Sequence, residues 1–169
     1  SQAESLEEEV KTANEEIRRL NKNLSHTEQD YHTAHTKLES LRNLAERYDG
    51  YGNSIKRVME VRDRVKGIHG VVADLIDVPK EYEIAIETAL GGSIQNIVTD
   101  SEQTAKILIE PLKKNRFGRA TFLPLSAISA GNGFNTPGAL KEPGAIGIAA
   151  DLVHVQPEYQ TLARYLLGR

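Results

Sequence analysis

The sequence predicts an α+β fold, in which a long coiled-coil helix leads into a globular domain with an internal duplication. Three observations support this prediction: an apolar seam through the first 48 residues, a change of composition at residue 50, and a 22-residue repeat at a constant offset of 77. A heptad seam must be buried against another helix. The β-branched runs and glycine-rich turns after residue 50 are typical of a domain with its own sheet and core.

The seam advances in alternating four- and three-residue steps without a break. A single helix cannot bury its own face, so this spacing predicts a left-handed coiled-coil arm helix over residues 1–49 and a partner helix to cover it. The seam positions are Leu6, Val10, Ala13, Ile17, Leu20, Leu24, Thr27, Tyr31, Ala34, Leu38, Leu41, Ala45 and Tyr48.

The positions that flank the seam indicate which kind of partner helix is expected. In a parallel homodimer none of the facing flank positions would form a firm pair of opposite charges, and Lys37 would face Arg42. Parallel self-association normally uses these positions to fix partner and orientation. We therefore expect an antiparallel returning helix. A parallel dimer with permissive flanks remains the alternative.

Composition divides the chain near residue 50. Residues 1–49 contain seven Lys and Arg against eleven Asp and Glu, with no Gly and no Pro. Residues 50–169 contain 14 Lys and Arg against 13 Asp and Glu, together with all 13 Gly and all six Pro. A turn-rich segment of this length is able to bury its own core. The sequence therefore predicts two domains, 1–49 and 50–169.

Several classes of function are disfavoured by the composition and the motifs. The absence of Cys removes disulfides and thiolate metal sites, and suggests an intracellular protein. No segment has the length and hydrophobicity of a membrane span, and no phosphate-binding Gly-x4-Gly-Lys-Ser/Thr loop occurs. No catalytic constellation is recognisable. We expect neither an enzyme nor a bound cofactor or metal, and no membrane association.

The repeat pairs residues 70–91 with residues 147–168, and nine of the 22 positions are identical. In the first copy the β-branched run 71–78 predicts a strand, and Pro79 followed by an amphipathic pattern predicts a helix over 79–90. A strand over 94–99 and a helix over 101–114 are expected next, with Pro111 kinking or dividing that helix. The second copy predicts the same strand and helix.

The counterparts of residues 94–114 would fall beyond residue 169, so the second half of the duplicated domain is expected to be truncated. Alternatively, residues 144–169 finish the domain as an edge strand and a capping helix. These patterns divide the globular domain into a first subdomain (50–125), a loop (126–143) and the start of a second subdomain (144–169).

Five segments, in this order behind a heptad arm, resemble the hinge domain of bacterial SMC chromosome-partition proteins. They are residues 67–73 (GIHGVVA), 78–82 (VPKEY), 85–92 (AIETALGG), 95–98 (QNIV) and 118–125 (GRATFLPL). The resemblance implies an SMC-hinge-like domain that dimerises with a second SMC hinge at the end of an antiparallel coiled coil. It also implies a returning helix from the same parent chain, a parent ATPase, a role in chromosome condensation and segregation, and a cytoplasmic, nucleoid-associated location.

In that family the hinge interface uses sheet edges, which makes two short segments candidates for dimer contacts. They contain Arg119, Ala120, Thr121, Phe122, Leu123, Gly147 and Ile148.

Two clusters of basic residues are candidates for weak, sequence-independent contacts with DNA, because Lys and Arg side chains neutralise backbone phosphates. They contain Lys56, Arg57, Arg62, Arg64, Lys66, Lys113, Lys114 and Arg116. A solvated face with local ion pairs is the alternative for these residues. For the whole chain, the alternative function is a parallel homodimeric coiled-coil scaffold that carries a protein- or ligand-binding head and has no DNA role.

Overall fold

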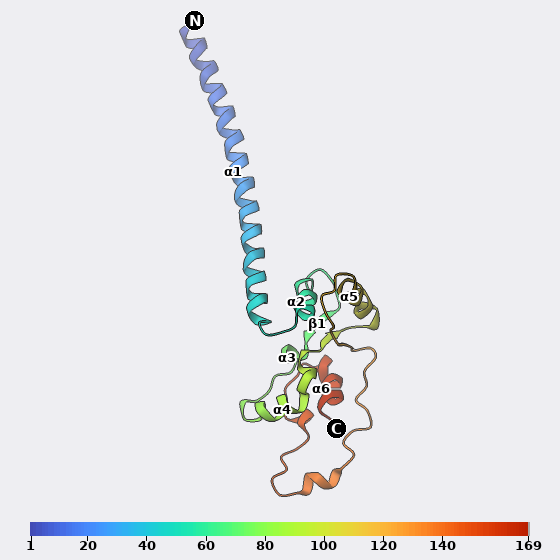
Figure 1. Cartoon of the computed structure of the whole chain (residues 1–169). Coiled ribbons are helices and arrows are strands. Elements are labelled where there is room, and N and C mark those ends of the chain that lie inside the picture. The colour runs from blue at the N-terminus through green and yellow to red at the C-terminus, as the bar shows by residue number, and fades with distance from the viewer. Residues whose placement is uncertain (169) are drawn as a thin grey trace. The chain divides into compact units, whose positions relative to one another are not determined.

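The structure is a computed structural model that describes residues 1–168. It consists of two compact units, one formed by Ser1–Arg47 and the other by the described residues from Tyr48 onward (Figure 1). No helix in the described part of the chain has both the length and the hydrophobicity to cross a membrane.

Helix α1 (Gln2–Arg47) forms the first unit and runs without interruption. None of its residues is buried, and the large seam residues are about half exposed, with Leu6 at 56% and Tyr31 at 62%. In proteins, a helix gains most of its stability from packing its apolar face against another element. The uncovered seam is therefore the side on which a partner helix would stabilise α1.

Tyr48 was predicted as the last seam residue, and this prediction is wrong. Helix α1 ends at Arg47, and the chain turns through Gly50, whose φ of +89° favours glycine. Tyr48 is only 1% exposed and lies within the second unit, where its hydroxyl donates to Asp74 Oδ2 at 2.5 Å. Its ring packs edge-on against Tyr51. Tyr48 fits the heptad spacing, but its side chain is buried in the globular unit and is not part of the exposed seam.

The second unit contains a three-stranded sheet in the order β1-β2-β3. Strand β1 (Ile68–Val71) pairs antiparallel with β2 (Ile97–Thr99), and β2 pairs parallel with β3 (Phe122–Pro124). The central strand β2 is buried at all three positions. Its β-branched residues suit a strand covered on both faces.

The strand predicted over 71–78 is mostly not a strand. The chain leaves the sheet at Val71 and forms the short helix α3 (Val72–Leu75), and only Asp77 makes an isolated bridge further on. After Val71 the N–H of Val72 still donates to the Asn96 carbonyl at 3.0 Å, but the Val72 carbonyl accepts from the N–H of Ile76 at 3.2 Å, which closes a helical turn. The strand predicted over 94–99 is also shorter, since residues Gly91–Gln95 form the 3₁₀ turn η2.

The predicted helices are present with small shifts of their ends. The turn η1 (Lys80–Tyr82) leads into α4 (Glu83–Leu90), and α5 spans Glu102–Lys114. Helix α2 (Asn53–Glu60) was not predicted. The backbone N–H of Thr104 donates to Ser101 Oγ at 3.3 Å, which caps the start of α5. Helix α5 continues through Pro111, so of the two expected effects of this proline, a kink or a division of the helix, the division is wrong.

The second copy repeats the element order of the first copy at the same offset of 77 residues. The turn η4 (Ala149–Asp151) corresponds to α3, η5 (Pro157–Tyr159) to η1, and α6 (Gln160–Leu167) to α4. The predicted strand of the second copy is likewise replaced by η4 and one bridge. The loop between the copies is mostly exposed and contains only the 3₁₀ turn η3 (Pro137–Lys141).

The two copies meet at Asp77 and His154, which are counterparts in the repeat. The N–H of Asp77 donates to the carbonyl of His154 at 2.9 Å, and the N–H of His154 donates to the carbonyl of Asp77 at 2.8 Å. This reciprocal pair is what a local two-fold relation requires. Helices α4 and α6 also contact each other, and both copies contribute to one core with β2 and β3. The duplication has therefore produced a single folded body.

Candidate interaction surfaces

The two predicted basic clusters come together where α2 contacts the end of α5. The guanidinium of Arg57 lies 5.0 Å from the centre of the Phe117 ring, and Ser54 Oγ donates to the carbonyl of Arg119 at 2.6 Å. We define the α2–α5 basic cluster as Lys56, Arg57, Lys113, Lys114 and Arg116. The two basic segments are more than 50 residues apart in the sequence, so their proximity could not be predicted from local patterns.

The charges in the α2–α5 basic cluster are not equivalent. Lys56 Nζ lies 3.9 Å from Asp49, and Arg57 pairs with Glu60 at 3.1 Å, so part of their charge is compensated locally. Lys113, Lys114 and Arg116 are exposed, and none of them forms an ion pair with another residue of the 1–168 range. Exposed, uncompensated cations are the ones available to a polyanion.

Phe117 was missed by sequence reasoning as part of this surface. It stands between Arg116, which has a φ of +53°, and Gly118, which has a φ of +103°, so the chain turns sharply after α5. Phe117 is half-buried, and its ring is covered on one side by the guanidinium of Arg57. This cation–π contact holds the two basic segments together. An aromatic residue inside a run of basic residues was the signal available in the sequence.

The other basic candidates follow α2 and differ among themselves. Arg64 and Lys66 are exposed in the turns between α2 and β1. Arg62 instead donates from Nη2 to the backbone carbonyl of His69 at 2.7 Å. The structure therefore places Arg62 against β1 and leaves Arg64 and Lys66 open to solvent.

Two of the dimer candidates, Phe122 and Leu123, lie on strand β3, which forms one edge of the sheet, and three more, Arg119, Ala120 and Thr121, directly precede it. Ile97 N–H donates to the Thr121 carbonyl, and Leu125 N–H donates to the Thr99 carbonyl, both at 2.8 Å. The backbone N–H and C=O groups of successive residues point to opposite sides of a strand, so those of Phe122 point away from β2. Within the described residues no strand pairs with that side of β3. Leu123 is buried, whereas Arg119 is exposed and Ala120 half-buried.

Gly147 and Ile148, the remaining dimer candidates, are not on the sheet. They lie just before η4 at the start of the second copy, with Gly147 exposed and Ile148 half-buried. Their counterparts in the first copy, Gly70 and Val71, belong to β1.

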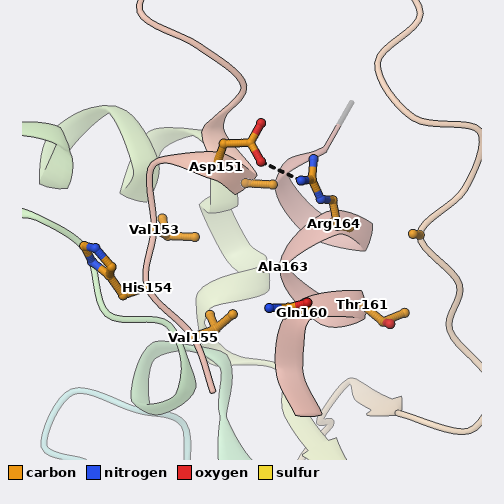
Figure 2. A pocket seen from close by; sticks show the side chains of 10 residues that line it. Asp151, Val153, His154, Val155, Gln160, Thr161, Ala163 and Arg164 are labelled. Atoms are coloured by element: carbon orange, nitrogen blue, oxygen red, sulfur yellow. Dashed lines mark hydrogen bonds and ion pairs between the residues drawn. The ribbon is translucent and has the colours of Figure 1, made fainter. Parts of the chain in front are cut away.

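A cavity of about 510 Å³ lies in the second copy, between α6 and the segment from η4 to Val155 (Figure 2). The first copy has a smaller counterpart of about 210 Å³. The residue Ala163 stands where the first copy has Ile86, which leaves more room in the second copy. Among the titratable groups of the lining, Arg164 is paired with Asp151 at 2.5 Å, and His154 Nδ1 lies 4.0 Å from Asp77 Oδ2. The cavity therefore does not combine titratable groups in a way that suggests catalysis.

Two titratable groups near β1 have shifted pKa values. The hydrogen bond that Thr104 donates lowers the pKa of Asp100, and burial opposes this change while the Ser101 hydroxyl supports it. Burial raises the pKa of Tyr159, and the Glu158 carboxylate adds to the rise while Arg62 opposes it. Both shifts favour the form that each group ordinarily has near neutral pH, an ionised Asp100 and a neutral Tyr159.

Comparison with known families identifies the globular unit. A family model described as the SMC proteins flexible hinge domain matches residues 65–169. The chain belongs to the SMC hinge family. The predicted resemblance is therefore confirmed, and so is the α+β fold with a long N-terminal helix. The hinge is a non-catalytic domain, so this chain is not itself an enzyme.

The relatives of this hinge are SMC proteins and SMC hinge domains from several organisms. The Chromosome partition protein Smc of Lactiplantibacillus plantarum is 42% identical over 135 residues, which are 79% of this chain and 11% of the relative. An asymmetric dimer of the Geobacillus stearothermophilus SMC hinge domain matches with a TM-score of 0.66 and 40% identity, over 83% of this chain and 62% of that chain. The Pyrococcus furiosus Smc hinge domain with an extended coiled coil matches with a TM-score of 0.58 and 27% identity, over 79% of this chain and 46% of that chain.

Proposed function

We propose that this hinge joins two SMC chains, and that the free edge of β3 forms part of the contact between them. The observation that carries the proposal is the uncovered edge at Phe122, where backbone hydrogen-bonding groups are left for another strand. The Geobacillus stearothermophilus relative forms a hinge dimer, which supports self-association here. The boundaries predicted for this role, 1–49 for the arm and 50–169 for the hinge, differ by two residues from the division of the structure, whose second unit starts at Tyr48.

The proposal assigns the seam of α1 to an antiparallel returning helix of the same parent protein. The support is the exposed apolar seam from Leu6 to Ala45 together with the unfavourable flank pair of a parallel dimer, Lys37 with Arg42. The Pyrococcus furiosus relative also carries a coiled coil on its hinge. In the parent protein, two such arms would be held together at the hinge during chromosome condensation and segregation in the nucleoid.

Replacing Phe122 by Pro tests the β3 contact. Proline removes the outward N–H at this edge, and we expect dimer affinity to fall about 10–100-fold, because an unsatisfied hydrogen-bond partner costs about 1–3 kcal/mol. Phe122→Val is the control, since it keeps the N–H. Sedimentation equilibrium of the 169-residue chain measures the dissociation constants. Equal constants for the two variants, or a wild-type chain that stays monomeric, would contradict the role of β3.

We further propose that the α2–α5 basic cluster, with Arg64 and Lys66, contacts DNA weakly and without sequence preference. The support is the proximity of the two basic segments and the exposed cations at the end of α5, Lys113, Lys114 and Arg116. Binding of this kind depends on the release of counterions and weakens steeply with salt.

Neutralising the three exposed cations at and just after the end of α5 tests the DNA contact. The variant Lys113→Gln/Lys114→Gln/Arg116→Gln is expected to lower the slope of log affinity against log salt by about 2–3, since each lost phosphate contact accounts for about 0.9. The control Lys22→Gln/Lys37→Gln/Lys141→Gln makes the same charge change at exposed positions elsewhere. Fluorescence anisotropy with a duplex oligonucleotide measures both slopes. If the two triple variants behave alike, binding depends on net charge and not on this surface.

A further inference from the structure

Arg62 occupies an unusual position for a residue of a basic segment. It lies in the turns that follow α2, close in sequence to the exposed Arg64 and Lys66. Its guanidinium donates from Nη2 to the backbone carbonyl of His69 at 2.7 Å, and the residue is half-buried. A charged donor on a carbonyl makes a stronger hydrogen bond than a neutral donor does. Arg62 is therefore fixed on β1.

The side chain of His69 continues this contact to the second copy. Its Nδ1 shares a hydrogen bond of 2.7 Å with the hydroxyl of Tyr159, and the two rings meet edge-to-face with centres 5.4 Å apart. Tyr159 is buried at the end of η5, directly before α6. The three residues form a continuous path from the basic segment, across β1, to the second copy.

The repeat indicates that this path is not an automatic product of the duplication. The counterpart of Tyr159 is Tyr82, but the counterpart of His69 is Ile146, which has no polar side chain and is 69% exposed. The backbone pair of Asp77 and His154 is symmetric between the copies, whereas the path through His69 occurs on one side only. It therefore ties the second copy to β1 in addition to the symmetric contact.

We propose that Arg62, His69 and Tyr159 form a clamp that holds the second copy against β1, and that Arg62 is a positioning residue of this clamp and not a phosphate contact. The statement about phosphate rests on the proposed DNA contact, while the clamp itself does not. The other charged groups that act on the clamp are Asp100, close to His69, and Glu158, close to Tyr159.

The matched variants Arg62→Gln and Arg64→Gln separate the two roles in the 169-residue chain. Arg62→Gln is expected to speed amide hydrogen exchange in α6 about tenfold, the factor that corresponds to 1.4 kcal/mol, and to leave the salt slope of DNA binding unchanged. Arg64→Gln is expected to leave exchange in α6 unchanged and to lower the salt slope by about 0.9.

Tyr159→Phe provides a second test that keeps the ring and removes only the hydroxyl. It should also speed amide exchange in α6. In the double variant Arg62→Gln/Tyr159→Phe the rate of exchange should rise by less than the product of the two single factors, because both substitutions act on one clamp. Independent, fully multiplicative effects would overturn the clamp. So would an Arg62→Gln variant that lowers the salt slope as Arg64→Gln does while exchange in α6 stays unchanged.

The two proposals fail in distinguishable ways. If the wild-type chain does not bind DNA, the proposed DNA contact is wrong, and the exchange rates of α6 still decide the clamp. If Arg62→Gln does not fold, Arg62→Lys takes its place, because lysine keeps a donor of the same charge. The Arg62→Lys chain should fold, and its amides in α6 should exchange more slowly than those of Tyr159→Phe. An Arg62→Lys chain whose α6 exchanges as fast as in Tyr159→Phe would overturn the clamp.

Discussion

Replacing Leu162 by Ala is expected to lower the free energy of unfolding by about 2–5 kcal/mol. Leu162 lies on α6, is 0% exposed, and belongs to the core that both copies share with β2 and β3. Removing its side chain therefore leaves a cavity where the two copies meet, and the surrounding structure has little freedom to close it. Urea unfolding followed by tyrosine fluorescence measures the change without the strong helical signal of α1.

Ile84→Ala is the matched control for this experiment. Ile84 lies on α4 and is 83% exposed, so its truncation should change stability by no more than about 0.5 kcal/mol. A similar loss in both variants would mean that α6 is not part of the shared core. If Leu162→Ala speeds amide hydrogen exchange only within the second copy, without lowering the free energy of global unfolding, the two copies unfold separately.

Gly67→Ala is expected to destabilise the hinge clearly more than Gly118→Ala does. Both glycines have positive φ, +99° and +103°, so alanine at either site costs about 1–2 kcal/mol in backbone strain. At Gly67 the new Cβ would in addition lie 2.5 Å from Asp100 Oδ1, whereas at Gly118 the nearest atom is 3.8 Å away. Thermal and urea unfolding of the two variants measure the difference.

The close contact at Gly67 involves a carboxylate that is held in place. Asp100 accepts a hydrogen bond from the Thr104 hydroxyl at 2.6 Å, and its own N–H donates to the Gly67 carbonyl at 2.8 Å. The double variant Gly67→Ala/Asp100→Ala should therefore recover part of the stability that Gly67→Ala loses. If the two glycine variants lose the same stability, backbone strain alone explains the effect and the close approach does not matter.

The sequence predicted those helices that are determined by a local pattern, such as a regular spacing of apolar residues, a capping residue or a repeat. The heptad seam predicted α1, Ser101 with its following turn predicted the start of α5, and the repeat predicted that α6 would match α4. The strand over 71–78 failed, because β-branched residues favour burial as much as they favour strands. Burial against the shared core, which depends on residues far away in the sequence, selected α3 instead.

The candidate surfaces were less predictable than the helices. Sequence reasoning found the basic residues but treated Arg62 like its neighbours and passed over Phe117. The contacts that distinguish them, from Arg62 to His69 and from Arg57 to Phe117, join segments that are brought together only by the sheet and the helices around it. Tyr48 shows the same effect, since its partner Asp74 is 26 residues away.

The exposed loop between the copies has a consequence for the evolution of this hinge. Asp77 and His154 are joined directly through their backbones, so the intervening residues 126–143 do not set the geometry of that junction. Ile128 packs against the shared core and Ala130 lines the cavity, so the part of this loop that tolerates insertions and deletions is 131–143, where they change mainly the entropy of loop closure. A change of length in 131–143 should therefore leave the backbone pair of Asp77 and His154 intact.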